Sequence, residues 1–127
     1  MKPWSKHWKA SKKPAKQRKY TANLPLHLAR KLLSTTLSND LHNKYKKRNT
    51  PLRKGDIVKI LRGQFKKRTG KVDKILTKHQ RVIIEGITLT KKNGTTTPYH
   101  LHPSNLMITE LNLEDKKRIK HLERKHP

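Results

Sequence analysis

The sequence predicts a mainly β protein in which a small β-barrel at residues 51–111 follows a basic, partly helical N-terminal extension and precedes a C-terminal helix. Short β-branched runs separated by Gly and Asn-Gly turns recur through residues 51–111, a pattern typical of small barrels. Leucines recur at spacings of three and four across residues 21–50, as expected for short helices. Residues 1–54 carry sixteen Lys and Arg but one acid, so more than half of the net charge precedes Gly55.

The charge and composition restrict the classes to which the chain can belong. Thirty-three Lys and Arg stand against eight Asp and Glu, for a net charge of +25, and 31% of the 127 residues are hydrophobic. Such a chain repels itself and buries a small core, and a polyanionic partner relieves both problems. We expect neither disulfides nor membrane association, because Cys, long apolar runs and a strongly apolar helix face are absent from the sequence. The start of the chain lacks the apolar stretch of a signal peptide, so a cytoplasmic location is predicted.

Residues 1–20 are predicted to form a basic extended arm. They hold eight Lys and Arg, two Trp and one Tyr but almost no aliphatic side chains, so they have no core of their own. Trp4 and Trp8 are suited to stacking on unpaired bases, an interaction worth about 1–3 kcal/mol per base. Contact with a neighbouring protein, or no ordered contact, is an equal alternative for both rings.

Residues 21–50 are predicted to form a basic extension of two short helices. Pro25 suits the first turn of one helix, and residues 38–40 can cap a second that ends near Lys46. Helices of roughly two turns are unstable alone, so both must pack against another surface.

The barrel segment is predicted to hold five or so short strands. The predicted strands are Ile57–Leu61, Lys71–Leu76, Arg81–Ile84, Thr88–Lys92, Thr95–Leu101 and Leu106–Thr109. Arg53–Asp56 forms the turn before the first strand, Gln64–Thr69 is a basic loop, and Gly86 breaks the third strand. Asn93-Gly94 predicts a tight two-residue hairpin turn in which both residues take positive φ.

Residues 112–127 are predicted to form a C-terminal helix and tail. Asn112 can cap the helix, Glu114 and Asp115 lie at its positive end, and Arg124 and Lys125 lie at its negative end. Its apolar side is narrow, so the helix is expected to lie on a surface.

Residues 53–72, RKGDIVKILRGQFKKRTGKV, resemble the KOW motif, which is a strand, a basic loop and a second strand pivoting on a glycine. Gly70 is the glycine at which a side chain would clash, and Gly55 and Gly63 are spaced as barrel turns. Together with NLPLHLARKLLSTTLSNDLHNKYKKRNTPLRKGD at 23–56, HPSNLMITELNLEDKKR at 102–118 and Asn-Gly-Thr at 93–95, the motif resembles one family over roughly residues 15–125. That family is the KOW-domain ribosomal protein of the large subunit, the twenty-fourth family in the universal numbering, in its archaeal and eukaryotic form.

The resemblance implies an SH3-like barrel bound to large-subunit ribosomal RNA near the polypeptide exit tunnel, beside neighbouring ribosomal proteins. It also implies binding early in ribosome assembly, with no cofactor and no small-molecule substrate. Many members of the family have glycine where this chain has Lys67.

The candidate RNA-binding residues are mostly Lys and Arg in four groups: the arm, the two short helices, the KOW loop and its neighbours. They are Lys12, Lys13, Lys16, Arg18, Lys19, Arg30, Lys31, Lys44, Lys46, Lys47, Arg48, Arg62, Phe65, Lys66, Lys67, Arg68, Lys71 and His102. The alternative for each cation is a solvated basic face. Phe65 is expected either to stack on a base or sugar or to fill the mouth of the barrel.

Neither a metal site nor an enzyme active site is predicted. His79, His100 and His102 lack the Cys and acidic partners of a metal site, so hydrogen bonding of His102 to RNA or to backbone at the strand end is predicted. Ser104 and the nearby His residues do not form a recognisable catalytic constellation, so no enzyme is predicted. Two rival functions are a KOW module associated with transcription and a histone-like protein that compacts DNA.

Overall fold

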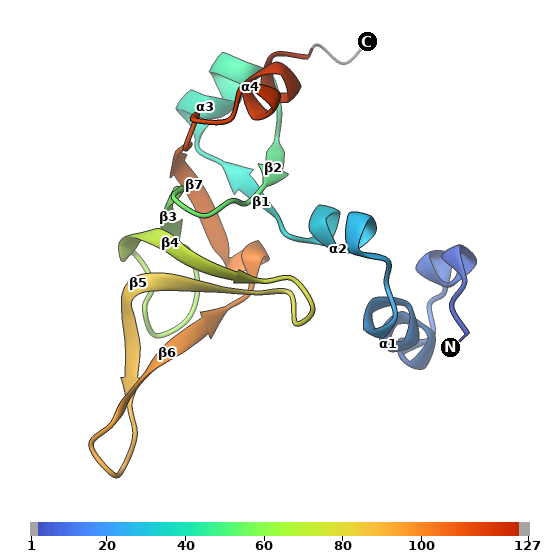
Figure 1. The fold of residues 1–127 in the computed structure, drawn as a ribbon, viewed down its shortest axis with the longest axis horizontal. Coiled ribbons are helices and arrows are strands. Elements are labelled where there is room, and N and C mark those ends of the chain that lie inside the picture. Colours follow the sequence, from blue (N-terminus) through green and yellow to red (C-terminus); the bar gives the residue numbers. More distant parts are fainter. Residues whose placement is uncertain (1–2, 125–127) are drawn as a thin grey trace.

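A computed structural model describes residues 3–124 and shows a mainly β fold (Figure 1). Its helices are η1 (Lys6–Ala10), α1 (Pro14–Ala22), α2 (Leu26–Leu32), α3 (Asn39–Tyr45), η2 (Pro103–Asn105) and α4 (Lys116–Glu123), where η denotes a 3-10 helix. Its strands are β1 (Ser34–Leu37), β2 (Asn49–Pro51), β3 (Ile57–Ile60), β4 (Thr69–Leu76), β5 (Arg81–Thr90), β6 (Thr96–Leu101) and β7 (Leu106–Glu110). None of the described helices has the length and apolarity that a membrane crossing requires.

The strands within residues 3–124 form one sheet of seven strands in the order β2-β1-β7-β3-β4-β5-β6. β1 and β7 run parallel, and the other neighbouring pairs are antiparallel. β2 and β6 are the edges of this sheet, so it is not closed into the barrel that the sequence predicts. Register shifts in three of the pairs bend the sheet instead.

The core lies between the strands of the bent sheet. Apolar residues alternate between buried and less buried positions along β3 and β7, as the period of two requires. The buried cluster is Leu37, Leu52, Val58, Ile60, Val72, Val82, Ile84, Ile87, Leu101, Leu106 and Ile108. Two of these residues come from the segment before β3, so that segment is part of the same folded unit.

Strand β5 replaces two of the predicted strands. The prediction that Gly86 ends a strand is wrong, because Gly86 lies within β5 at φ +77°. The register of β5 against β6 shifts between Ile83 and Thr88, and pairing continues on both sides of the shift. A glycine with positive φ at such a shift lets the strand bend and continue, and Figure 1 shows the bend.

The β5–β6 hairpin has a longer turn than the sequence predicts. The Lys91 N–H donates to the Thr95 carbonyl at 2.8 Å, and the Gly94 N–H donates to the Lys91 carbonyl at 3.0 Å. Gly94 has φ +85°, but Asn93 does not have positive φ. The loop is therefore a three-residue turn closed by a glycine bulge. The Asn93 side chain accepts hydrogen bonds from the Thr95 N–H and hydroxyl, which stabilises this longer form.

The N-terminal segment is helical, so the prediction of an extended arm without a core is wrong. The Trp4 and Tyr20 rings stack with their centroids 5.6 Å apart, and the Trp4 indole N–H donates to the Tyr20 carbonyl at 3.1 Å. The side-chain amide of Gln17 lies within hydrogen-bond distance of three main-chain carbonyls at the end of η1 and just after it. Two aromatic rings and one amide thus supply contacts that aliphatic side chains usually make.

The two short helices of the extension are present as α2 and α3. Pro25 and Ser38 occupy their N-cap positions, and Lys46 ends α3 in the left-handed conformation at φ +54°. Strands β1 and β2, which the sequence analysis did not predict, flank α3 and pair with each other. β1 also pairs with β7, so the extension is joined to the sheet by backbone hydrogen bonds.

The C-terminal helix α4 begins later than predicted. Asp115, rather than Asn112, caps it by accepting a hydrogen bond from the Lys117 N–H at 2.8 Å. Hydrogen bonding by the Arg53 side chain is the largest cause of the lowered pKa of Asp115, and hydrogen bonding by the Lys117 N–H is the next. The helix ends at Glu123, and Lys125, expected at its negative end, lies outside the described residues.

Candidate nucleic-acid interface

The basic loop between β3 and β4 is held by main-chain hydrogen bonds across its base. The Ile60 N–H donates to the Arg68 carbonyl, and the Lys67 N–H donates back to the Ile60 carbonyl, both at 2.8 Å. A turn bond from the Lys66 N–H to the Gly63 carbonyl, 3.1 Å long, fixes the tip. The three cationic side chains of residues 66–68 are exposed. The structure therefore gathers them on a short restrained loop, which loses less entropy on binding than a free tail.

Lys67 adopts the left-handed conformation, with φ +72°. A residue with a Cβ pays roughly 1–2 kcal/mol in this region, whereas glycine does not. Glycine, which the family resemblance leads one to expect at this position, would take this conformation without that cost. In this chain the lysine takes this conformation at the cost of local strain and adds a cation to the loop.

Gly70 allows two strands to approach closely. A Cβ built on it would lie 2.5 Å from Cγ2 of Ile84 and 3.1 Å from the Glu85 carbonyl oxygen, so the predicted clash is confirmed. However, Gly70 lies within β4 opposite Val58 and does not have positive φ, so it is not itself the turn. Gly55 and Gly63 do have the positive φ expected of turn glycines, at +92° and +97°.

Of the two cations predicted to bind RNA beside the loop, only one lies next to it. Arg62 is exposed beside the loop, whereas Lys71 pairs with Ile57 at the far end of the β3–β4 ladder. The half-buried ring of Phe65 packs against Tyr99, with centroids 5.1 Å apart, and the Arg68 guanidinium lies 5.3 Å from the Phe65 ring. Phe65 thus packs within the protein, and its predicted stacking on a base or sugar stays a prediction.

His102 hydrogen-bonds to backbone at the end of β6, one of the two roles predicted for it. Its Nδ1 accepts from the Ser104 N–H at 3.2 Å and lies 2.7 Å from the Ser104 hydroxyl, so the ring caps η2. Burial, and to a lesser degree the positive charge of Arg81, lower the pKa of His102 below its usual 6.5. Among residues 3–124 no three His, Cys, Asp or Glu side chains gather as a ligand set for a metal ion.

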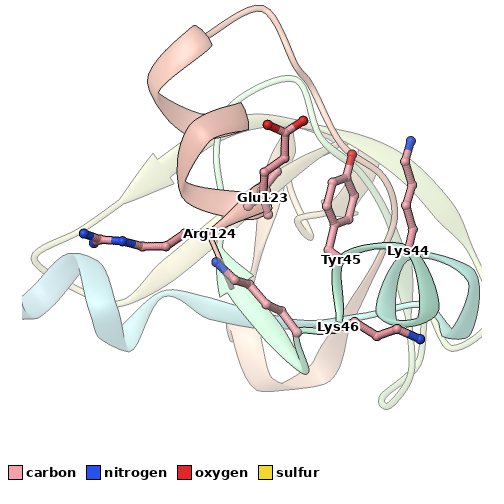
Figure 2. A pocket seen from close by; sticks show the side chains of 7 residues that line it. Lys44, Tyr45, Lys46, Glu123 and Arg124 are labelled. Atoms are coloured by element: carbon pink, nitrogen blue, oxygen red, sulfur yellow. The ribbon is translucent and has the colours of Figure 1, made fainter. Parts of the chain in front are cut away.

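The cations at the end of α3 border a groove of about 520 Å³ against the end of α4 (Figure 2). Lys47 donates from Nζ to the His121 carbonyl, so it bridges the helices. The Lys44 ammonium lies 5.3 Å from the centre of the Tyr45 ring. Lys44, Lys46 and Arg48 are exposed, and Figure 2 shows Lys46 and Arg124 pointing in different directions. The predicted cluster is thus partly structural and partly open to a partner.

Arg30 and Lys31 are exposed on the last turn of α2. Consecutive helical residues point in different directions. Arg30 lines a groove together with Arg53 and Lys54, and Lys31 is not part of its lining. The two candidate cations therefore point in different directions from α2, and only Arg30 lines this groove.

The cations of the N-terminal segment are mostly available. Lys12, Lys13, Arg18 and Lys19 are exposed, whereas the Lys16 ammonium lies 4.9 Å from the centre of the Trp8 ring. Because Trp4 stacks on Tyr20 and Trp8 faces Lys16, both indoles have partners within the segment. Sequence reasoning missed this arrangement, since the four-residue spacing of the two rings does not reveal what they face.

A buried ion pair, also missed by sequence reasoning, positions the start of β3. The Arg118 guanidinium makes two bonds to the Asp56 carboxylate, of 2.5 and 2.7 Å, and the two side chains are 4% and 0% exposed. Asp56 ends the turn that precedes the β3–β4 hairpin, and Arg118 belongs to α4. The four-residue spacing of Arg118 and the buried Leu122 is the one signal that could have placed Arg118 on the inner face of the helix.

Most of these elements lie in the part of the chain that matches a known protein family. The model of the family described as ribosomal proteins L26 eukaryotic, L24P archaeal matches residues 11–125. This range includes α1, α2, the loop between β3 and β4, and α4. The match covers nearly the whole chain. The chain belongs to this family of large-subunit ribosomal proteins.

Proposed function

We propose that the protein is a structural constituent of the large ribosomal subunit that binds ribosomal RNA and stabilises its fold during assembly. The observation that carries this proposal is the KOW loop, where main-chain bonds fix Lys66, Lys67 and Arg68 in exposed positions. Among residues 3–124 none of these three cations forms an ion pair with a carboxylate. Unpaired cations on a restrained loop are suited to phosphate.

In the proposed RNA binding, a preformed loop acts together with basic residues that are spread over several helices. The hairpin β3–β4, with Gly70 packed against Ile84, supports an SH3-like KOW platform for the loop. The N-terminal segment, α2 and α3 extend the basic surface away from it (Figure 1). Neutralising phosphates along several RNA segments releases counterions and holds those segments together. Specificity then comes from RNA shape, unpaired bases and 2′-hydroxyl groups.

The family and the surface together define the proposed setting. The partners are large-subunit ribosomal RNA and neighbouring large-subunit proteins, and the site is the ribosome in the cytoplasm, near the polypeptide exit tunnel. The role is structural and non-enzymatic, as is typical of ribosomal proteins.

A binding comparison tests the proposal against the histone-like alternative. The full chain is titrated with a large-subunit rRNA transcript and with duplex DNA of equal nucleotide number, at several salt concentrations. We expect the rRNA to bind at least about tenfold more tightly at physiological salt. Equal affinity for the two polymers at every salt concentration would contradict the proposal.

A further inference from the structure

A second groove lies between the KOW loop and the end of β6. Its walls come from residues 62–65 of the loop, from Arg81 at the start of β5, and from residues within 99–105 of β6 and η2. Its volume of about 230 Å³ equals that of roughly eight water molecules at ~30 Å³ each. This is the scale of one nucleobase rather than of a duplex.

The groove is positively charged and has no acidic lining residue. Its two guanidinium groups, those of Arg62 and Arg81, form no ion pair within residues 3–124. Arginine binds phosphate through several N–H donors at once, so these two groups suit the backbone of a nucleotide.

Polar groups inside the groove are suited to the edge of a base. Because Nδ1 of His102 accepts from the Ser104 N–H, the ring proton is on Nε2, which is therefore a donor. The side-chain amides of Gln64 and Asn105 have no hydrogen-bond partner in the part of the chain that the structure describes. Each amide offers both donors and an acceptor, the combination that reads base edges.

The groove is preformed and has an aromatic wall. Phe65 and Tyr99 pack with an interplanar angle of 60°, and both contribute to the lining of the groove. The Leu61 N–H donates to the Asn105 carbonyl at 2.8 Å, which ties the end of β3 to η2. A wall of this kind can stack against an unpaired base, and the restrained walls reduce the entropy lost on binding.

We propose that this groove binds one unpaired nucleotide of the ribosomal RNA, turned out of its helix, with its phosphate at Arg62 and Arg81 and its base edge at Gln64, His102 and Asn105. The inference rests on the proposed function, because it names one contact by which the protein reads the same RNA. It differs from the loop contacts, which neutralise phosphates without regard to the base.

The test uses the full chain and a large-subunit rRNA transcript. Arg81→Gln and Asn105→Ala are compared with Lys74→Gln, which removes a charge from an exposed residue of β4 outside the groove. Affinity is measured across salt concentrations, unpaired nucleotides are mapped with a reagent that modifies flexible RNA, and melting temperatures confirm that each variant folds. We expect Arg81→Gln to lose about fivefold more affinity than Lys74→Gln. We also expect one nucleotide to be protected by the wild-type protein and to become reactive with Asn105→Ala.

The outcomes separate this inference from the proposed function. If the wild-type chain binds the rRNA but both groove variants match Lys74→Gln in affinity and in the map, the groove does not bind a nucleotide and the inference is overturned. If Arg81→Gln weakens binding but no single nucleotide responds to Asn105→Ala, the groove binds phosphate alone, which also overturns it. If the wild-type chain shows no preference for the rRNA, the proposed function fails first and the inference fails with it.

Discussion

The Asp56 carboxylate and the Arg118 guanidinium form a buried two-point ion pair that joins the turn before β3 to helix α4. Both groups are also bonded to the main chain. Asp56 accepts from the N–H groups of Arg53 and Asn112, and Arg118 donates to the carbonyls of Asn112 and Pro51. Burying two charges is tolerated when attraction and additional hydrogen bonds replace their hydration, as they do in this network.

Breaking this pair is predicted to destabilise the fold strongly. Asp56→Ala leaves the guanidinium of Arg118 buried without a counter-charge, which costs about 3–5 kcal/mol in the free energy of unfolding, measured by urea titration. The control is Lys54→Ala, which breaks an exposed ion pair with Asp73. It should change the free energy of unfolding by less than about 1 kcal/mol. A double variant with Arg118→Met should lose less than the sum of the single losses. Strict additivity would show that the two side chains do not act as a pair.

The KOW loop is predicted to supply phosphate contacts. Replacing Lys66, Lys67 and Arg68 by Ala should weaken binding to rRNA and reduce the slope of log affinity against log salt by about two to three. The measurement is a salt titration of wild-type and triple-variant protein with the same transcript. An unchanged slope would mean that the loop faces solvent in the complex.

The strain at Lys67 gives a separate prediction about stability. Lys67→Gly should raise the free energy of unfolding by roughly 1 kcal/mol or less, because glycine accepts φ +72° while adding some entropy to the unfolded chain. Lys66→Gly is the matched control, since it removes the same charge where φ is not positive. Thermal unfolding compares the two, and equal effects would show that the strain is not real.

The N-terminal segment is predicted to hold structure before RNA binds. Native-state hydrogen exchange of the free protein should show α1 amides that are protected, though less than those of β3 and β4. Gln17→Ala and Trp4→Ala should reduce that protection, because they remove the bonds and the ring contact that join η1 to α1. Wild-type α1 amides that exchange at the rate of an unstructured peptide would favour an arm that orders on RNA alone.

Much of the sheet could be predicted because its signals are local. The structure places β3, β4, β6 and β7 within two residues of their predicted bounds, since β-branched runs between turn residues define them. Strands β1 and β2 were missed because each is four residues or shorter, and because β1 pairs with the distant strand β7 while β2, within residues 3–124, pairs with β1 alone. The N-terminal core was missed because it depends on contacts between residues sixteen apart, Trp4 and Tyr20, which carry no periodic pattern.

Some residues of the candidate site could likewise be predicted from the sequence, and others could not. The loop cations follow from the KOW motif, which is contiguous in sequence, and the structure shows residues 66–68 together and exposed. The Asp56–Arg118 pair spans 62 positions, and the second groove joins loop residues to Arg81 and Asn105. Contacts of this range arise from the folded sheet, and neither composition nor spacing reveals them.

Association with the large ribosomal subunit tests the central claim most directly. Cell extract is separated on a sucrose gradient, and the protein is detected in each fraction alongside large-subunit rRNA. We expect the protein to sediment with large subunits and with intact ribosomes, and high salt to release it by weakening its phosphate contacts. A protein found at the top of the gradient, with none in the large-subunit fractions at low salt, would contradict the account.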